Sequence, residues 1–387
     1  MPDMITLFLP LSLAHQNLRK KMGIAERIAD IEKEMSRTQI NKATEYHLGK
    51  LKAQLARLRA QLVEESSRGG DGGPQFDVAR TGDARVCLFG FPSVGKSSLL
   101  SKITDYQSPI GDYDFTTVTA IPAILEVNGV KIQLLDLPGI LQGASGGFGK
   151  GKQVLGVVRS CDLVVYVIDA AKADTEIGTL TEELHSFGIR VNELPPAVDI
   201  TPMVKGGVTI DWTVPQTHMD ESYMREIATA NRFRSGHIHI CEDITIDRFI
   251  DAFNVKSLRY IPAMFVYNKI DTLTMEEIDR LAHLPRSVVA SVLYGLGLEM
   301  IKQKIFDMLE ITRVYTKPPG EKPDFEGAVL LRKGATVRDL CMKIHKDLAE
   351  NFKTAQVWGR SVKRPGQPVG LSHFLSDEDV ACIKTAK

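Results

Sequence analysis

The sequence predicts an α/β fold built around a phosphate-binding loop. Residues 90–97 read Gly-Phe-Pro-Ser-Val-Gly-Lys-Ser, between an apolar run at 85–89 that predicts a strand and a helix start at 98–103. Strand, glycine-containing loop and helix in this order form the context in which such a loop binds phosphate. Two further apolar runs, 131–135 and 263–267, each end in a polar motif. Polar motifs at the carboxyl ends of parallel strands are typical of a nucleotide-binding sheet.

The residues of the loop predict how phosphates would be held. Gly90 and Gly95 permit backbone angles that other residues resist, so that loop amides can converge on a phosphate at the positive end of a helix. We expect Lys96 to reach the β- and γ-phosphates and the Ser97 hydroxyl to ligate Mg²⁺. An ordinary strand–turn–helix is the alternative, and the correct flanks on both sides disfavour it. The predicted phosphate-binding residues are Gly90, Phe91, Pro92, Ser93, Val94, Gly95, Lys96, Ser97 and Ser98.

The motif after the run at 131–135 predicts a metal site. Asp136 and Gly139 belong to a D-x-x-G motif, in which the carboxylate holds Mg²⁺ through water and the glycine amide senses the γ-phosphate. Thr117 lies between the loop and this motif, where a switch threonine would meet both Mg²⁺ and the γ-phosphate. Mg²⁺ is therefore the expected cofactor, with Ser97, Thr117 and Asp136 around it.

The motif after the run at 263–267 predicts the base. Asn268, Lys269 and Asp271 follow that run directly, and Ser291 ends the next predicted strand. A carboxylate at Asp271 would accept the N1–H and the 2-amino protons of guanine, a pair of donors that adenine lacks. We expect the side chain of Ser291 to contact the base as well. The sequence thus predicts GTP and GDP as ligands.

Together with the segment Asp112-Tyr113-Asp114-Phe115-Thr116-Thr117, these motifs resemble the developmentally regulated GTP-binding proteins of the Obg-related GTPases. The resemblance extends from about Met22 to the C-terminus, and residues 275–282 and 328–335 look closer to the second of two eukaryotic paralogues. It implies a P-loop GTPase domain with an inserted small α+β module, an N-terminal helical hairpin and a C-terminal β-grasp TGS domain. It also implies association with the ribosome or RNA and with a stabilising partner protein.

The resemblance leaves the cofactor set and the catalytic group open. Some relatives use K⁺ held by an Asn of the loop, but Ser93 stands at that position here, so K⁺ is only a candidate beside Mg²⁺. Many GTPases place a water-orienting Gln directly after D-x-x-G, where this chain has Ile140, and no arginine finger is identifiable. We expect slow intrinsic hydrolysis, with no catalytic residue assigned. The candidate switches are 112–117 and 143–151.

Hydrophobic spacing and chain length predict the domain boundaries. Apolar residues at helical spacing, from Ile24 to Met35 and from Leu48 to Leu62, predict two antiparallel helices. From Asp136 to Asn268 is 132 residues, where a minimal GTPase needs about 60, so an insertion is expected. The predicted parts are an extension or misassigned start at 1–21, the hairpin at 22–66, a linker at 67–82, the GTPase domain at 83–171 and 246–311, the inserted module at 172–245, and the TGS domain at 312–387. Within the TGS domain we expect a strand at 327–331, a helix at 336–350 and a strand at 355–359.

Composition restricts the partners and the location. The chain has 48 basic and 48 acidic residues, so it has no bulk attraction to nucleic acid or membranes, and DNA is not an expected partner. Five widely spaced cysteines indicate reduced thiols, and no apolar run has the length of a membrane span. The prediction is a soluble, cytoplasmic protein.

Two local groups of basic residues could still contact RNA. The first, on the outer face of the second predicted helix, comprises Lys50, Lys52, Arg57 and Arg59. The second, in the TGS domain, comprises Lys343, His345, Lys346, Lys353, Arg360, Lys363 and Arg364. In both places a solvated surface is the alternative, and Trp358 is expected in a core. Two functions remain open: a ribosome-associated translation and growth-regulating GTPase switch, or a nucleotide-gated scaffold whose output is partner binding, with hydrolysis incidental.

Overall fold

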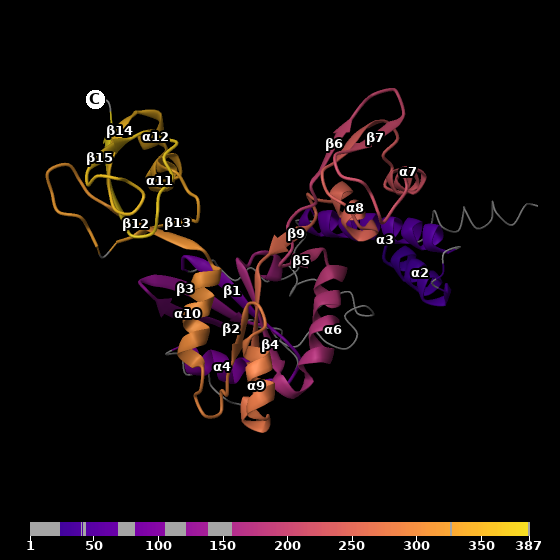
Figure 1. Ribbon diagram of the computed structural model, residues 1–387, viewed down its shortest axis with the longest axis horizontal. Helices are drawn as coiled ribbons and strands as arrows, with labels where there is room; N and C mark the ends of the chain where they lie inside the picture. The colour runs from indigo at the N-terminus through magenta and orange to yellow at the C-terminus, as the bar shows by residue number, and fades with distance from the viewer. Residues whose placement is uncertain are drawn as a thin grey trace, which may run out of the picture. The chain divides into compact units, whose positions relative to one another are not determined.

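The computed structural model describes residues 24–385 except 40, 42–43, 69–81, 105–120, 138–156 and 326 (Figure 1). Residue contacts divide the chain into two units. We call Met1–Pro74 with Glu183–Tyr260 the hairpin unit, and Gln75–Glu182 with Ile261–Lys387 the P-loop unit. Each is described by itself.

A six-stranded sheet in the order β11-β10-β4-β1-β3-β2 forms the centre of the P-loop unit. Its strands are β1 (Ala84–Phe89), β2 (Ile121–Val127), β3 (Val130–Asp136), β4 (Leu163–Asp169), β10 (Ala263–Asn268) and β11 (Ser287–Val289). All neighbours are parallel except β2 and β3. Every residue of β1 is buried, as expected for a strand covered on both faces. The predicted α/β fold class is therefore confirmed.

Helices follow the strands of this sheet and carry the rest of its core. They are α4 (Lys96–Ile103), η1 (Ala170–Lys172), α6 (Ala173–Ser186), η2 (Ile270–Thr272), α9 (Met275–Ala282) and α10 (Leu298–Met308). Leu99 of α4 and Ile301 of α10 are fully buried in one cluster with Leu88, Leu134 and Val266 of the strands. Because β1 runs directly into the loop before α4, the rigid sheet fixes where that loop lies (Figure 1).

The C-terminal part of the P-loop unit is a second mixed sheet, in the order β13-β12-β16-β14-β15. Its elements are β12 (Ile311–Thr316), β13 (Val329–Arg332), α11 (Val337–Ile344), α12 (Lys346–Glu350), β14 (Phe352–Trp358), β15 (Gln367–Val369) and β16 (Asp379–Thr385). Val337 and Leu340 of α11 pack on the sheet. The single helix predicted at 336–350 is wrong, because His345 has extended backbone angles that separate α11 from α12.

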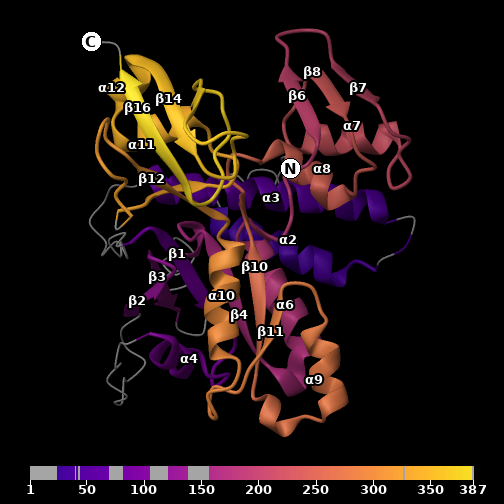
Figure 2. The same ribbon diagram turned by 60° about the vertical axis from the view of Figure 1, so that its left-hand side comes forward.

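The hairpin unit combines the N-terminal helices with the inserted segment. Its elements are α2 (Ile24–Arg37), α3 (Glu45–Arg68), β5 (Ile189–Val191), β6 (Val198–Pro202), β7 (Val208–Trp212), α7 (Glu221–Ala230), β8 (Gly236–Ile240), α8 (Ile246–Phe253) and β9 (Arg259–Ile261). The predicted apolar stripes of α2 and α3 meet, since Ile28 packs with Leu55 and Leu58. A three-stranded sheet in the order β6-β8-β7 packs on α7 and α8. Helix α3 lies beside α8 in both views and places Ala53 in that same core (Figures 1 and 2).

Residue contacts place the limits of the inserted segment differently from the sequence pattern. The segment that joins the hairpin unit runs from Glu183 to Tyr260, whereas the predicted module covers 172–245. Helix α8, which lies in the predicted GTPase domain, packs in the core of the hairpin unit through Phe249 and Ile250. The domain boundaries themselves stay a prediction.

The first group of basic residues does not form a free outer face. Lys50 pairs with Glu226 of α7 at 3.0 Å, and Lys52 pairs with Asp247 of α8 at 3.0 Å. Arg57 donates to the carbonyl of Ala230 at 2.6 Å, and Arg59 pairs with Glu32 of α2 at 2.8 Å. Each of these basic groups therefore already has a partner within the unit, which favours the alternative of a solvated surface, and RNA contact by this group stays a prediction. Along the described part of the chain, no helix is both long and apolar enough to cross a membrane.

Candidate nucleotide-binding site

The loop between β1 and α4 is tightly confined. Gly95 has a φ of 98°, and a Cβ added there would lie 2.5 Å from Nδ2 of Asn268. A Cβ on Gly90 would lie 2.1 Å from the carbonyl oxygen of Val167. Gly90 is thus required by the space beside β4, and not by a left-handed backbone as the loop pattern suggested. Ser93 is the other left-handed residue of the loop, with a φ of 62°.

Lys96 is folded back into the loop. Its Nζ donates to the carbonyl oxygens of Gly90 at 3.0 Å and Phe91 at 2.8 Å, and the residue is only 8% exposed. Burial lowers the pKa of the Lys96 ammonium below its ordinary value, while the charges of Asp136 and Glu176 act in the opposite direction. The loop carbonyls therefore hold the Lys96 ammonium in place. A phosphate could replace them as the acceptor of its hydrogen bonds.

The two described metal-site candidates lie in direct contact. Ser97 Oγ donates to Oδ2 of Asp136 at 2.5 Å. The other oxygen, Oδ1, is buried and has no hydrogen-bond partner in the described structure. Burial raises the pKa of Asp136, which the hydrogen bond from Ser97 and the charge of Lys96 partly offset. A hydroxyl and a buried carboxylate with a spare oxygen fit Mg²⁺, a hard cation that takes few protein ligands and keeps waters and phosphate oxygens.

The remaining phosphate-side candidates cannot be placed. Thr117 and Gly139 lie outside the described residues, as do Ile140 and both candidate switches. Among the residues that are described, no group of three or more His, Cys, Asp and Glu side chains is arranged for a metal ion.

Asn268 ties the loop to the opposite side of the site. It is 3% exposed; its Nδ2 donates to the carbonyl of Val94 at 2.8 Å, and its Oδ1 accepts from the amide of Val292 at 3.0 Å. One side chain thus joins the phosphate-binding loop to the loop after β11. The sequence pattern singled out Asn268 but not Val292. Val292 contributes only its backbone amide, which the type of residue does not reveal.

The base-reading candidates converge at the ends of β10 and β11. Ser291 is fully buried, and its Oγ donates to Oδ1 of the exposed Asp271 at 2.5 Å. Lys102 of α4 donates to the carbonyl of Leu293 at 2.9 Å and holds the loop that follows Ser291. Lys269 has a left-handed backbone, with φ of 65°, and its Nζ lies 2.8 Å from Oδ2 of Asp169. Asp169 and Lys102 were missed by sequence reasoning, although Asp169 is an acid that directly follows the apolar residues of β4.

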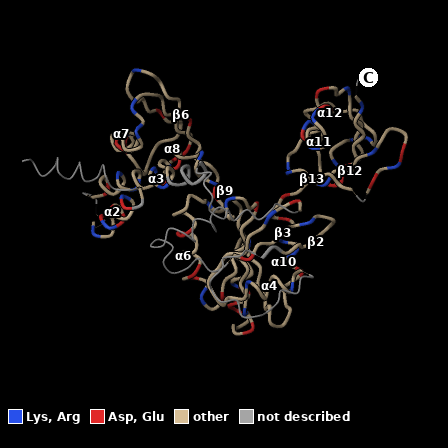
Figure 3. The backbone as a smooth tube through the Cα atoms, turned by 180° about the vertical axis from the view of Figure 1, so that it is seen from behind, with Lys and Arg blue, Asp and Glu red and all other residues tan. Residues whose placement is uncertain are grey.

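The second group of basic residues is more open than the first. Lys346 pairs with Glu350 at 3.5 Å and His345 with Asp347 at 3.4 Å. All seven members are exposed, in the part of the chain around α11 and α12 (Figure 3), and five of them form no ion pair with another described residue: Lys343, Lys353, Arg360, Lys363 and Arg364. Trp358, the last residue of β14, is half-buried, and Nζ of Lys317 lies 4.9 Å from its ring centroid, so its ring is only partly inside the core.

Three family models match consecutive parts of the chain. Residues 85–201 match the family described as a 50S ribosome-binding GTPase, and residues 205–311 match the C-terminal region of the MMR_HSR1 domain. Residues 312–385 match the TGS domain, which confirms that part of the predicted fold.

Curated relatives align over nearly the whole chain. The chain is 50% identical over 364 residues to GTP-binding protein 1 of Schizosaccharomyces pombe, covering 94% of this chain and 100% of the relative. It is 48% identical to Developmentally-regulated GTP-binding protein 2 of Mus musculus, covering 94% and 99%. The homolog of the latter in Dictyostelium discoideum is also 48% identical, with the same coverage. The resemblance inferred from the motifs is thereby confirmed.

Proposed function

Because the chain belongs to the family of developmentally regulated GTP-binding proteins, we propose that it is a slowly hydrolysing GTPase switch that acts in association with ribosomes. The observation that carries the GTP part is the contact of Ser291 with Asp271 beside the tether from Asn268 to Val94. It brings a carboxylate suited to guanine and the phosphate-binding loop to one edge of one sheet.

The proposed nucleotide-binding residues divide by the part of the nucleotide they face. The loop and Lys96 would bind the phosphates, while Asn268, Lys269, Asp271 and Ser291 would hold the base side. Ser97 and Asp136 would hold Mg²⁺, with Thr117 completing the set. The ion, when bound, would neutralise phosphate charge. The residues proposed for the nucleotide are Gly90, Phe91, Pro92, Ser93, Val94, Gly95, Lys96, Ser97, Ser98, Thr117, Asp136, Gly139, Asn268, Lys269, Asp271 and Ser291.

Slow hydrolysis is proposed from the residue after D-x-x-G. Ile140 carries no group that can orient an attacking water, which is a large part of GTPase catalysis. Single-turnover hydrolysis in Na⁺ and in K⁺ buffers measures the rate and also tests K⁺ as a cofactor. Fast single-turnover hydrolysis of GTP in both buffers, in the absence of any partner, would contradict the proposal.

Ribosome association is proposed from the exposed basic residues of the TGS domain. They are free to meet a phosphate backbone, whereas the basic residues of α3 are already paired. Such contacts release counterions, so binding should weaken steeply as salt rises. The proposal includes a cytoplasmic location and a stabilising partner protein, as the resemblance implies.

Cosedimentation with ribosomes across a salt series tests this proposal. The full-length chain is compared with a variant in which Lys343, Lys353, Arg360, Lys363 and Arg364 are changed to Gln, with GDP or a non-hydrolysable GTP analogue. A smaller control changes Lys131 and Lys322 to Gln, which are exposed elsewhere in the P-loop unit. We expect the TGS variant alone to lose most association and the salt dependence. Unchanged cosedimentation of that variant would overturn the ribosome assignment.

The scaffold alternative is distinguished by the nucleotide cycle. Ser97→Asn, which removes the proposed Mg²⁺ hydroxyl, should abolish output in either case. A variant that binds GTP but does not hydrolyse it should keep its cellular output if the protein is a scaffold, whereas a switch needs hydrolysis to complete its cycle.

A further inference from the structure

Lys269 is held in an unusual backbone conformation at the end of β10. Its φ of 65° and ψ of 36° lie in the left-handed region, which is unfavourable for a residue with a Cβ. The side chain is also long and flexible, with a compact ammonium at the end of a four-carbon stem. A residue in this state keeps one position only if contacts from its surroundings fix it.

Asp169 supplies that contact from the neighbouring strand. Strands β4 and β10 are parallel, and Asp169 lies opposite Asn268 in the register, so the end of β4 faces the turn that contains Lys269. Oδ2 of Asp169 accepts from Nζ of Lys269 at 2.8 Å. The Asp169 side chain is 15% exposed and that of Lys269 is 41% exposed, so the acid is the more fixed partner.

Asp169 is itself held by its own helix start. Its Oδ1 accepts from the amide of Ala171 at 3.2 Å, and its amide faces Oε2 of Glu176 at 3.4 Å. The carboxylate therefore uses one oxygen for the backbone and the other for the ammonium. Although burial acts to raise it, the hydrogen bond from Lys269 and that from Ala171 hold the pKa of Asp169 below its ordinary value. The acid is thus ionised at neutral pH.

We infer that Asp169 is a positioning residue for the base side of the nucleotide site. Asp169 holds the ammonium of Lys269 at the end of β4 and thereby fixes the methylene stem of Lys269 between Asn268 and Asp271. The inference rests on the proposed role of Lys269 at the base. A stem fixed before the ligand arrives loses less side-chain freedom on binding. Asp169 belongs neither to the phosphate-binding loop nor to the residues proposed for Mg²⁺. Its effect on nucleotide affinity should therefore not depend on the γ-phosphate.

The structural alternative is that the pair only stabilises the fold. Ion pairs with one exposed partner contribute little to stability. A pair of this kind would change the melting temperature slightly and leave nucleotide affinity alone. A positioning role predicts the opposite pattern.

A double-mutant cycle on the full-length chain tests the inference. GDP and GTP affinities and dissociation rates are measured for wild type, Asp169→Ala, Lys269→Ala and the double variant. We expect Asp169→Ala to weaken GDP and GTP by the same factor, about tenfold, through faster dissociation. We expect it to add nothing in the Lys269→Ala background. Asp174→Ala, which alters an exposed acid nearby that pairs with Arg280 at 3.5 Å, serves as the matched control.

The ratio of GDP to IDP affinity separates this inference from the proposed function. IDP lacks the 2-amino group that Asp271 would read, so Asp271→Asn should change the ratio while Asp169→Ala preserves it. Full affinity of Asp169→Ala, or an equal loss on top of Lys269→Ala, would overturn the positioning role. Failure of wild type to bind GDP, or equal affinity for ADP, would instead overturn the proposed function.

Discussion

The hydroxyl of Ser291 donates to Oδ1 of Asp271 at 2.5 Å, across the ends of two parallel strands. Ser291 is fully buried and Asp271 is exposed, so a fixed donor orients a carboxylate that solvent and ligand can reach. The bond leaves the second oxygen of Asp271 available. A carboxylate placed in this way can accept two adjacent N–H groups, which guanine has and adenine lacks.

Replacing the carboxylate of Asp271 should therefore erode base selectivity. Hydrogen bonds to a charged group contribute about 1.5–3 kcal/mol, so Asp271→Asn should weaken GDP binding about tenfold or more with little effect on ATP. Competition of GDP and ATP against a labelled guanine nucleotide measures the change. Asp279→Asn, on the exposed face of α9, is the control. Equal competition by ATP in wild type would contradict the guanine assignment.

Lys96 connects phosphate binding to the stability of the loop. Its ammonium donates to the carbonyl oxygens of Gly90 and Phe91, and the residue is buried, so it contributes to the loop even without a ligand. Lys96→Ala should therefore abolish the rise in melting temperature caused by GTP–Mg²⁺ and also destabilise the ligand-free protein, by about 1–3 kcal/mol. Thermal melts with and without ligand measure both effects, with Lys131→Ala as an exposed control. A full ligand-induced rise in Lys96→Ala would show that Lys96 does not bind phosphate.

The parts of the fold that the sequence predicted are those encoded by local pattern. Continuous apolar runs marked β1, β3 and β10, because parallel strands buried on both faces have no polar side. The paired state of Lys50 and Lys52 could not be read in this way, since Glu226 and Asp247 come from a distant inserted segment. The break at His345 was missed for another reason: the apolar stripe continues across it into α12, so periodicity alone gives one helix.

The site shows the same division between local and long-range information. Side chains within known motifs were visible, and the structure brings Asn268, Asp271 and Ser291 together as strand order requires. The partners that hold them were not visible, because Val292 contributes an amide and Asp169 comes from a different strand end. Motif reading identifies groups that face a ligand, whereas their supports depend on tertiary packing.

Acid should weaken the C-terminal sheet through Asp377. Arg313 donates to both carboxylate oxygens of Asp377, at 3.1 and 2.6 Å. Although burial acts to raise it, these hydrogen bonds hold the pKa of Asp377 below its ordinary value. A carboxyl group with a lowered pKa in the folded state stabilises the fold above its unfolded pKa, about 3.9, and loses that contribution as the pH falls through the folded value.

The Arg313–Asp377 contribution can be isolated by difference. Many carboxylates titrate in the same window, so we compare the unfolding free energy of wild type and Arg313→Met from pH 7 to pH 3. Wild type should be more stable by a constant amount above about pH 5, and the difference should shrink below about pH 4. A difference that is the same at pH 3 and pH 7 would show that Arg313 acts by packing on Phe306 instead of by charge.

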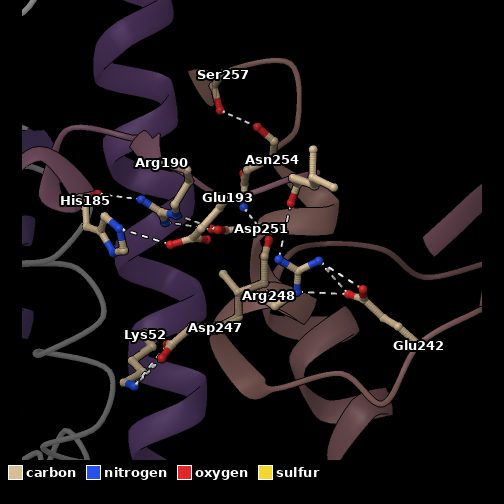
Figure 4. Close-up of polar contacts among 12 residues, drawn as sticks. Lys52, His185, Arg190, Glu193, Glu242, Asp247, Arg248, Asp251, Asn254 and Ser257 are labelled. Atoms are coloured by element: carbon tan, nitrogen blue, oxygen red, sulfur yellow. Dashed lines mark hydrogen bonds and ion pairs between the residues drawn. The ribbon is translucent and has the colours of Figure 1, made fainter. Parts of the chain in front are cut away.

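Two ion pairs in the hairpin unit offer a matched comparison of buried and exposed charge (Figure 4). Arg190 donates to both oxygens of Asp251 at 2.6 and 2.8 Å, with side chains 14% and 6% exposed. Lys52 pairs with Asp247 nearby, with side chains 41% and 69% exposed. Arg190 also donates to the carbonyl of His185 at 2.9 Å, so it joins the segment before β5 to α8.

Breaking the buried pair should unfold the hairpin unit far more easily than breaking the exposed one. Arg190→Met leaves the Asp251 carboxylate buried without its partner, which costs about 3–5 kcal/mol. Lys52→Met should cost less than about 1 kcal/mol, because water replaces the lost partner. Chemical denaturation of the two variants measures the costs, and Arg190→Met/Asp251→Leu should recover much of the loss, since no charge then remains buried. Equal costs for Arg190→Met and Lys52→Met would show that water reaches the Asp251 carboxylate and that the pair does not hold α8 in place.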